Sequence, residues 1–339
     1  MDRIGFLHDN LCDAALELGW RQWTAVGLAG VREGTGTLID PEALLLASLT
    51  LGRYDARLFD EILDWLVLNS RLLDLARLRR LSGRAAPGER RLLGTAARLV
   101  AERGGAANLE RLLVDDQEGV GAAAGFEREP LLYSHKGEEA QWGENDPLFA
   151  AAGFLRSPVQ LRGLSGRPKA ANPACLRFQL RALVGLGSRA EVLTYLLTHD
   201  WAHGRLIAER TAYGQAPVAL YLASLLEVHL VDRREEGKKV LYRVCDTLRE
   251  AVPARPLFVD WIRVWPALTA VLEALRPTGM TEEARWVRLA ATLAKHEPAF
   301  RTEGCAVEIG DLRGWALQGS DILATAVENV TAKVTELSV

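Results

Sequence analysis

Residues 188–244 decide the fold of this chain, and they read SRAEVLTYLLTHDWAHGRLIAERTAYGQAPVALYLASLLEVHLVDRREEGKKVLYRV. Apolar residues recur at helical spacing in three successive segments, and then alternate loosely in two short segments joined by a charged, glycine-containing turn. Ser188 is predicted to cap the first helix, with Glu191 in the position that completes a capping box. Gly214 is predicted to close the second helix in the left-handed conformation. The pattern predicts a helix-turn-helix followed by a small β-hairpin.

Over residues 176–245 the sequence resembles the winged helix-turn-helix superfamily of ArsR/MarR-like proteins. Three motifs carry the resemblance in order: RAEVLTYLL, LIAERTAYG and LASLLEVHLVDRREEGKKVLYRV. It implies a DNA-binding transcriptional regulator with its third helix in the major groove and its wing on the DNA backbone. It also implies a homodimer built by the helices that flank the winged helix. On this interpretation we expect DNA contact from Gln215 and Tyr221 of the third helix and from the cations of the second helix and wing, Arg205, Arg210, Arg233, Arg234, Lys238 and Lys239.

Charge limits how this segment could bind DNA. The third helix has no cation between Gly214 and Leu226, although bidentate base contacts favour Arg, Asn or Lys. Residues 188–244 hold eight basic and seven acidic side chains, whereas DNA affinity needs a concentrated basic face. We therefore expect phosphate contact from the second helix and the wing, and a base-edge contact from Gln215. The alternative is a protein-interaction adaptor or antitoxin-like partner, in which the winged helix is a docking surface.

The whole composition is that of an ordinary globular protein. The chain has 339 residues, a net charge of −3, 49% hydrophobic and 25% charged residues. No run of eighteen apolar residues is present, and the first residues lack the order of an export signal. We expect a cytoplasmic protein that does not bind membranes.

Motifs for catalysis, metals or cofactors are missing from the sequence. It contains no phosphate-binding loop, no H-E-x-x-H pair and no G-x-S-x-G elbow. The four cysteines are widely separated, which favours free thiols over a disulfide framework or a zinc site. We expect no enzyme activity, no metal and no cofactor. The cysteines are Cys12, Cys175, Cys245 and Cys305.

Helical periodicity extends over most of the chain and predicts a mainly α fold. We expect a helical N-terminal domain at 1–114, a linker and irregular region at 115–173, the winged helix at 174–246, and a C-terminal helical region at 247–339 that could form a dimer. Asp40 and Pro41 mark one helix start, because aspartate caps and proline suits the first helical position. Within the C-terminal region, residues 301–311 favour one short strand.

A basic cluster at residues 77–84, RLRRLSGR, admits two interpretations. One is a solvated helix face that pairs with the acids nearby in sequence, Asp60, Glu61, Asp64 and Asp74. The other is a phosphate-contacting patch on a second, wingless helix-turn-helix. The nearness of the acids favours the first.

Overall fold

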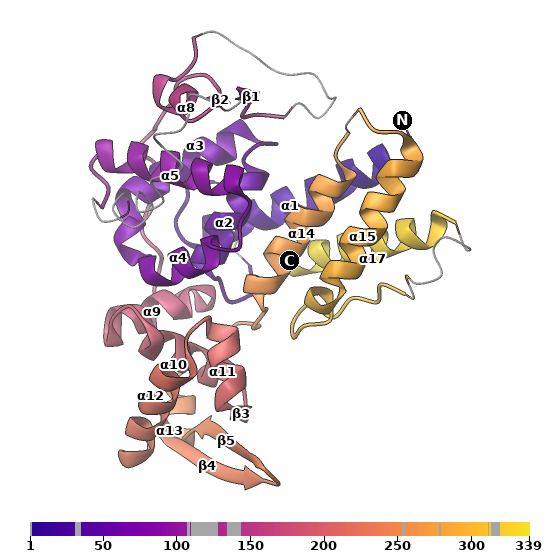
Figure 1. Ribbon diagram of the computed structural model, residues 1–339. Coiled ribbons are helices and arrows are strands. Elements are labelled where there is room, and N and C mark those ends of the chain that lie inside the picture. Colours follow the sequence, from indigo (N-terminus) through magenta and orange to yellow (C-terminus); the bar gives the residue numbers. More distant parts are fainter. Residues whose placement is uncertain are drawn as a thin grey trace.

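A computed structural model describes residues 2–30, 35–106, 109, 128–133, 144–252, 255–277, 279–310, 312 and 319–339. Most of these residues are helical, and the strands form two small sheets (Figure 1). The prediction of a mainly α fold is therefore confirmed. Within the expected linker and irregular region at 115–173, residues 115–127 and 134–143 lie outside the described residues.

The N-terminal helices begin where the sequence places capping aspartates. The Asp40 carboxylate accepts the Ala43 N–H at 3.1 Å and Pro41 follows it, so the predicted start of α2 is confirmed. Asp55 and Asp74 cap α3 and α4 in the same way, satisfying N–H groups that have no partner inside the helix. The elements are α1 (Arg3–Ala25), α2 (Pro41–Leu51), α3 (Ala56–Asn69), the 3-10 turn η1 (Ser70–Leu72), α4 (Leu75–Ser82) and α5 (Pro87–Glu102).

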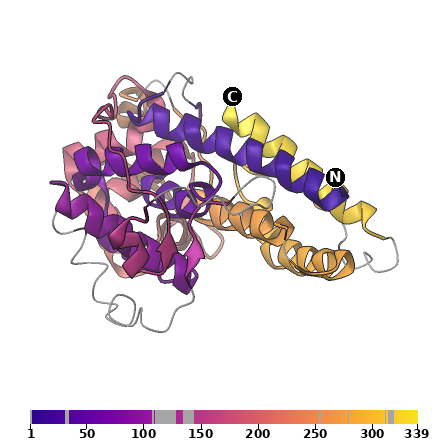
Figure 2. The same cartoon turned by 90° about the horizontal axis from the view of Figure 1, so that it is seen from above.

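Three long C-terminal helices pack on these N-terminal helices. They are α14 (Trp261–Leu275), α15 (Glu282–Phe300) and α17 (Asp321–Ser338). Helix α17 lies along α1, and α14 packs on α1, α2 and α15 (Figure 2). A single hydrophobic cluster runs through all of them and includes Trp23, Trp65, Trp261 and Trp265. The predicted domain boundaries stay predictions, but the regions 1–114 and 247–339 share one core.

We call this shared-core part, α1 to α5 with α8, α14, α15 and α17, the body. Helix α8 (Pro147–Ala151) lies on α5, and β1 (Glu129–Pro130) pairs in parallel with β2 (Phe154–Leu155) beside it. The strand expected at 301–311 is wrong for its described residues 301–310, none of which lies in a strand. Gly304 and Gly310 have positive φ there, which breaks an extended run and turns the chain.

Residues 173–252 form a second, protruding part, which we call the distal unit (Figure 1). Its interior is a separate hydrophobic cluster, which includes Val192, Leu196, Ile207, Leu222 and Val244. The hairpin of β4 and β5 is joined by β3 in a three-stranded antiparallel sheet of order β3-β5-β4. The elements are η3 (Pro173–Cys175), α9 (Leu176–Val184), α10 (Ser188–Thr198), β3 (Ala202–His203), α11 (Gly204–Thr211), α12 (Gln215–Glu227), β4 (Val231–Glu236), β5 (Lys239–Val244) and α13 (Asp246–Glu250).

Two predicted helix ends in the distal unit are wrong. Ser188 does not cap α10, because Gly187 takes the cap position and the predicted capping partner Glu191 points inward and is buried. Gly214 does not close α11, because Ala212 takes the left-handed conformation, with φ 59° and ψ 37°. Gly214 instead precedes α12 with extended backbone. Glu191 instead pairs with two arginines of α9, and contacts from the body hold the turn at Ala212, as described below.

Candidate functional site

The exposed face of α12 carries mostly small or apolar side chains. Helix α12 packs on α10, α11 and β4 through Val218, Leu222 and Leu225. Its outer positions are exposed, and Leu220 is 76% accessible to solvent. Gln215 is exposed in the first turn, where it could reach a ligand laid along the helix. The exposed residues of α12 are Gln215, Ala216, Pro217, Ala219, Leu220, Ala223, Ser224 and Glu227.

Three of the predicted contact residues are exposed cations with free charge. Arg205 lies in the first turn of α11, and Lys238 and Lys239 lie at the tip of the hairpin. Among the described residues, no acidic side chain forms an ion pair with any of the three. Their positive charge is therefore available to an anionic partner.

The two hairpin arginines are already paired. Arg233 contacts Glu235 at 2.7 Å, and Arg234 contacts Glu236 at 3.3 Å. Both pairs are exposed, so each contributes only about 0–1 kcal/mol and a phosphate could displace the glutamate. The acids nevertheless reduce the positive potential of the hairpin.

Arg210 and Tyr221 lie in more enclosed surroundings than the other predicted residues. Arg210 donates from Nη1 to the buried Asp260 carboxylate of the body at 2.6 Å. Burial raises the pKa of Asp260, and Arg210 offsets part of that rise. Tyr221 is half-buried, with the Arg189 guanidinium 5.9 Å from its ring centroid. Arg210 thus holds the distal unit to the body, and Tyr221 is only partly accessible to a partner.

The base of the hairpin holds an aromatic contact that the sequence did not predict. The Arg234 and Arg243 guanidinium groups lie 4.3 Å and 5.2 Å from the Trp201 ring centroid. Trp201 directly precedes β3, and Ala202 pairs with Tyr242 of β5. The contact depends on this third strand, for which the alternating pattern gives no signal. It braces the hairpin against the helices.

A buried ionic cluster joins the distal unit to the body. Three arginines and three carboxylates meet there, each at most 5% exposed. Arg77 of α4 donates to Asp40 at 2.7 Å and to Glu42 at 2.6 Å. Arg77 is therefore not available as a phosphate contact, and of the acids expected to pair with the basic cluster, Asp60 pairs with Arg156 and Glu61 with Arg162. The six members are Arg77, Arg177, Arg181, Asp40, Glu42 and Glu191.

Two arginines of α9 complete the cluster from the distal side. Arg177 lies 2.9 Å from Asp40 and 3.1 Å from Glu191. Arg181 lies 2.7 Å from both Glu42 and Glu191. Burial alone would raise the pKa of the Asp40 and Glu191 carboxyls, but the arginines hold both pKa values below the usual range. Asp40 and Glu191 therefore stay ionised at neutral pH, and the three carboxylates are matched in number by three arginines.

Further contacts from α4 fix the turn between α11 and α12. Arg77 and Arg80 donate to the Thr211 and Ala212 carbonyls, each at 3.0 Å. The Tyr213 hydroxyl donates to Asp74, and the Arg80 guanidinium lies 4.3 Å from the Tyr213 ring centroid. The body therefore sets the position of the helix pair whose outer face is exposed.

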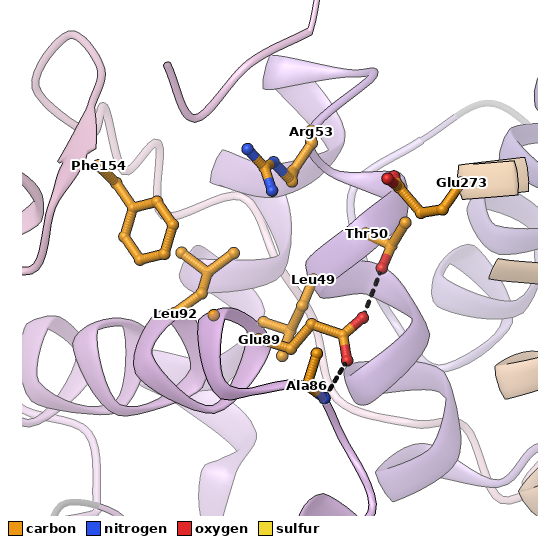
Figure 3. Close-up of a pocket in the computed structure, with 9 residues that line it drawn as sticks. Leu49, Thr50, Arg53, Ala86, Glu89, Leu92, Phe154 and Glu273 are labelled. Carbon is orange, nitrogen blue, oxygen red and sulfur yellow. Dashed lines mark hydrogen bonds between the residues drawn. The ribbon is translucent and has the colours of Figure 1, made fainter. Parts of the chain in front are cut away.

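A pocket of about 180 Å³ lies in the body, between the end of α2 and the start of α5 (Figure 3). Its apolar wall and its charged groups come from four elements that are distant in sequence, so no local motif marks it. The Glu89 carboxylate accepts the Thr50 hydroxyl and the Ala86 N–H, each at 3.0 Å. The lining residues are Leu49, Thr50, Arg53, Ala86, Gly88, Glu89, Leu92, Phe154 and Glu273.

The described residues contain no group of three or more His, Cys, Asp or Glu placed to hold a metal ion. Within the described ranges, every helix is too short or too polar to cross a membrane. No protein-family model matches the sequence, and the comparisons with curated proteins and with solved structures give no match.

Proposed function

We propose that the distal unit is a winged helix-turn-helix that binds double-stranded DNA, and that the chain is a transcriptional regulator. In this assignment α11 and α12 are the helix-turn-helix and the β4–β5 hairpin is the wing. The order of elements and the sheet order β3-β5-β4 support the assignment. The cytoplasmic location rests on the same proposal.

The observation that carries the proposal is the free positive charge of Arg205, Lys238 and Lys239. Phosphate contacts supply most of the affinity of proteins for DNA, and these three cations lie on exposed ends of α11 and the wing. Gln215 stands at the exposed start of α12, where an amide could bond a base edge. Because so few cations are free, we expect weak, strongly salt-dependent binding in which Arg233 and Arg234 join only after leaving their glutamates.

The homodimer is part of the same proposal. The apolar sides of α14 and α17 are buried within their own chain, against α1 and α2. Sedimentation equilibrium with and without duplex would measure the assembly state. A monomer in both conditions would remove the dimer from the proposal.

A second candidate is protein docking through α12, and one observation favours it. The exposed face of α12 carries Leu220 and three alanines but no cation, and it is therefore better matched to an apolar partner than to phosphate. In this alternative the chain is an adaptor or antitoxin-like partner.

Fluorescence anisotropy of a random-sequence duplex at graded salt tests DNA binding. We expect Lys238→Glu to weaken binding and to lower the salt slope by about 1, since each phosphate contact adds about 0.9. The matched control is Lys295→Glu, which makes the same charge change at an exposed site on α15 of the body. Equal weakening by both variants would show a general charge effect and remove the wing from the mechanism. If no duplex binds at low salt, the regulator assignment is wrong.

A further inference from the structure

We propose that the pocket between α2, α5, β2 and α14 binds a free α-amino acid with an apolar side chain. The proposal concerns the body alone and does not depend on DNA binding. It rests on three features of the pocket: its size, an unpaired carboxylate on one side, and an incompletely used guanidinium on another.

The pocket has the size and wall of a site for one small apolar group. Its volume is about 180 Å³, and an engineered protein cavity of about 150 Å³ admits benzene. Leu49, Leu92 and Phe154 form the apolar part of the wall (Figure 3). A single ring or a branched aliphatic chain fits this space, whereas a nucleotide would not.

One side of the pocket offers a carboxylate without a cation. Glu89 accepts hydrogen bonds from Thr50 and Ala86, and no described cation forms an ion pair with it. Each carboxylate oxygen can accept a further bond, so Glu89 could bind an ammonium group. Glu273, across the pocket, is already paired with Arg276 at 3.1 Å. The free negative charge is therefore on Glu89.

Arg53 supplies a guanidinium donor on the opposite side, although it shares its charge with Glu129 at 3.2 Å and lies 4.1 Å from the Tyr133 ring centroid. Its Nε bonds the Leu131 carbonyl at 2.9 Å, and its Nη2 bonds the Pro130 carbonyl and the Glu129 carboxylate. Its Nη1 has no partner among the described residues, and Figure 3 shows the guanidinium turned toward the side of Phe154. A ligand carboxylate could bond Nη1 while its ammonium bonds Glu89. A positive and a negative group above an apolar wall match a zwitterion better than a simple amine or acid.

Isothermal titration of the full chain with L-phenylalanine and L-leucine tests the proposal directly. The single-charge probes are 2-phenylethylamine, which lacks the carboxylate, and 3-phenylpropionate, which lacks the ammonium. We expect at least one amino acid to bind, and each single-charge probe to bind about tenfold more weakly or worse, because each lacks one charge-assisted hydrogen bond. The proposal is overturned if neither amino acid binds, or if the amine binds as tightly as the amino acid.

Two glycines of α5 provide a matched pair of variants. A Cβ added at Gly88 or at Gly94 would meet no atom within 4 Å, but only Gly88 lines the pocket. Gly88→Leu should fill the pocket and abolish binding, while Gly94→Leu should bind as the parent does, with thermal melting to show that both fold. Glu89→Gln should weaken amino-acid binding at least tenfold. Equal loss in the Gly94 variant, or retained binding in the Gly88 variant, would place the ligand elsewhere and sink the proposal.

Discussion

Ala212 adopts an unusual backbone conformation for a residue with a side chain. Its φ of 59° is left-handed, which costs a residue with a Cβ about 1–2 kcal/mol. The strain persists because the turn is held at several points: the Tyr213 N–H bonds the Ala208 carbonyl at 3.0 Å, and Arg80 bonds the Ala212 carbonyl. The backbone thus follows a contact made by the body, 132 residues away in sequence.

Ala212→Gly should stabilise the protein. Glycine takes the left-handed conformation without the steric cost, and this gain exceeds the extra freedom it gives the unfolded chain, so we expect a rise of up to about 1 kcal/mol in the free energy of unfolding. The control is Ala219→Gly, at an exposed helical position of α12, which should lose about 1 kcal/mol. Urea unfolding measures both. A loss in both variants would mean that the left-handed turn stores no strain.

At the scale of elements, α2 connects the two features of the body that concern function. Asp40 and Glu42 at its start belong to the ionic cluster that holds the distal unit. Thr50 and Arg53 at its end line the pocket. The joint with the distal unit and the pocket therefore lie at opposite ends of one short, buried helix.

The two proposed functions, DNA binding and protein docking, make different use of the exposed face of α12. The variant Leu220→Lys distinguishes them. Leu220 is 76% exposed, so the change should leave stability within about 0.5 kcal/mol. If α12 faces DNA, the added cation should tighten duplex binding and raise the salt slope by about 1. If α12 docks an apolar partner, the charge should weaken that contact instead.

Val287→Lys is the control for this test, because Val287 is a 54% exposed valine on α15 of the body. Fluorescence anisotropy with a random-sequence duplex compares the two variants. Unchanged affinity for Leu220→Lys, or the same gain in both, would place DNA away from α12.

For the whole molecule, the sequence predicts local secondary structure well, but it predicts the contacts between distant segments poorly. The presence of the hairpin and of most helices follows from periodicity, and Asp40 and Pro41 give the start of α2 correctly. Glu191 was misassigned because glutamate is the expected residue both in a capping box and in a buried ion pair with arginine, and the sequence alone does not distinguish the two. Arg77 was misassigned because its partners are distant in sequence, and the Thr211 carbonyl that it bonds lies 134 residues away. The pocket could not be predicted, since four elements must fold before it exists.

The ionic cluster should make the folded chain sensitive to acid. Asp40 and Glu191 have lowered pKa values in the folded protein and return to ordinary values of 3.8 and 4.5 when it unfolds. The unfolded chain therefore binds more protons as the pH falls. The stabilisation should be complete above about pH 5 and decline below it, by about 1.4 kcal/mol per pH unit for each carboxylate. Urea unfolding at a series of pH values measures this slope.

Glu191→Gln separates the cluster from the other carboxylates of the chain. It keeps the size of the side chain but removes the charge that faces Arg177 and Arg181, so at neutral pH we expect a loss of about 3–5 kcal/mol. Because one titrating group is gone, its unfolding free energy should also fall less steeply with acid than that of the parent. Glu328→Gln, exposed on α17, is the control and should change neither quantity by more than about 0.5 kcal/mol. Parallel pH profiles for the parent and Glu191→Gln would show that acid sensitivity arises outside the joint between the body and the distal unit.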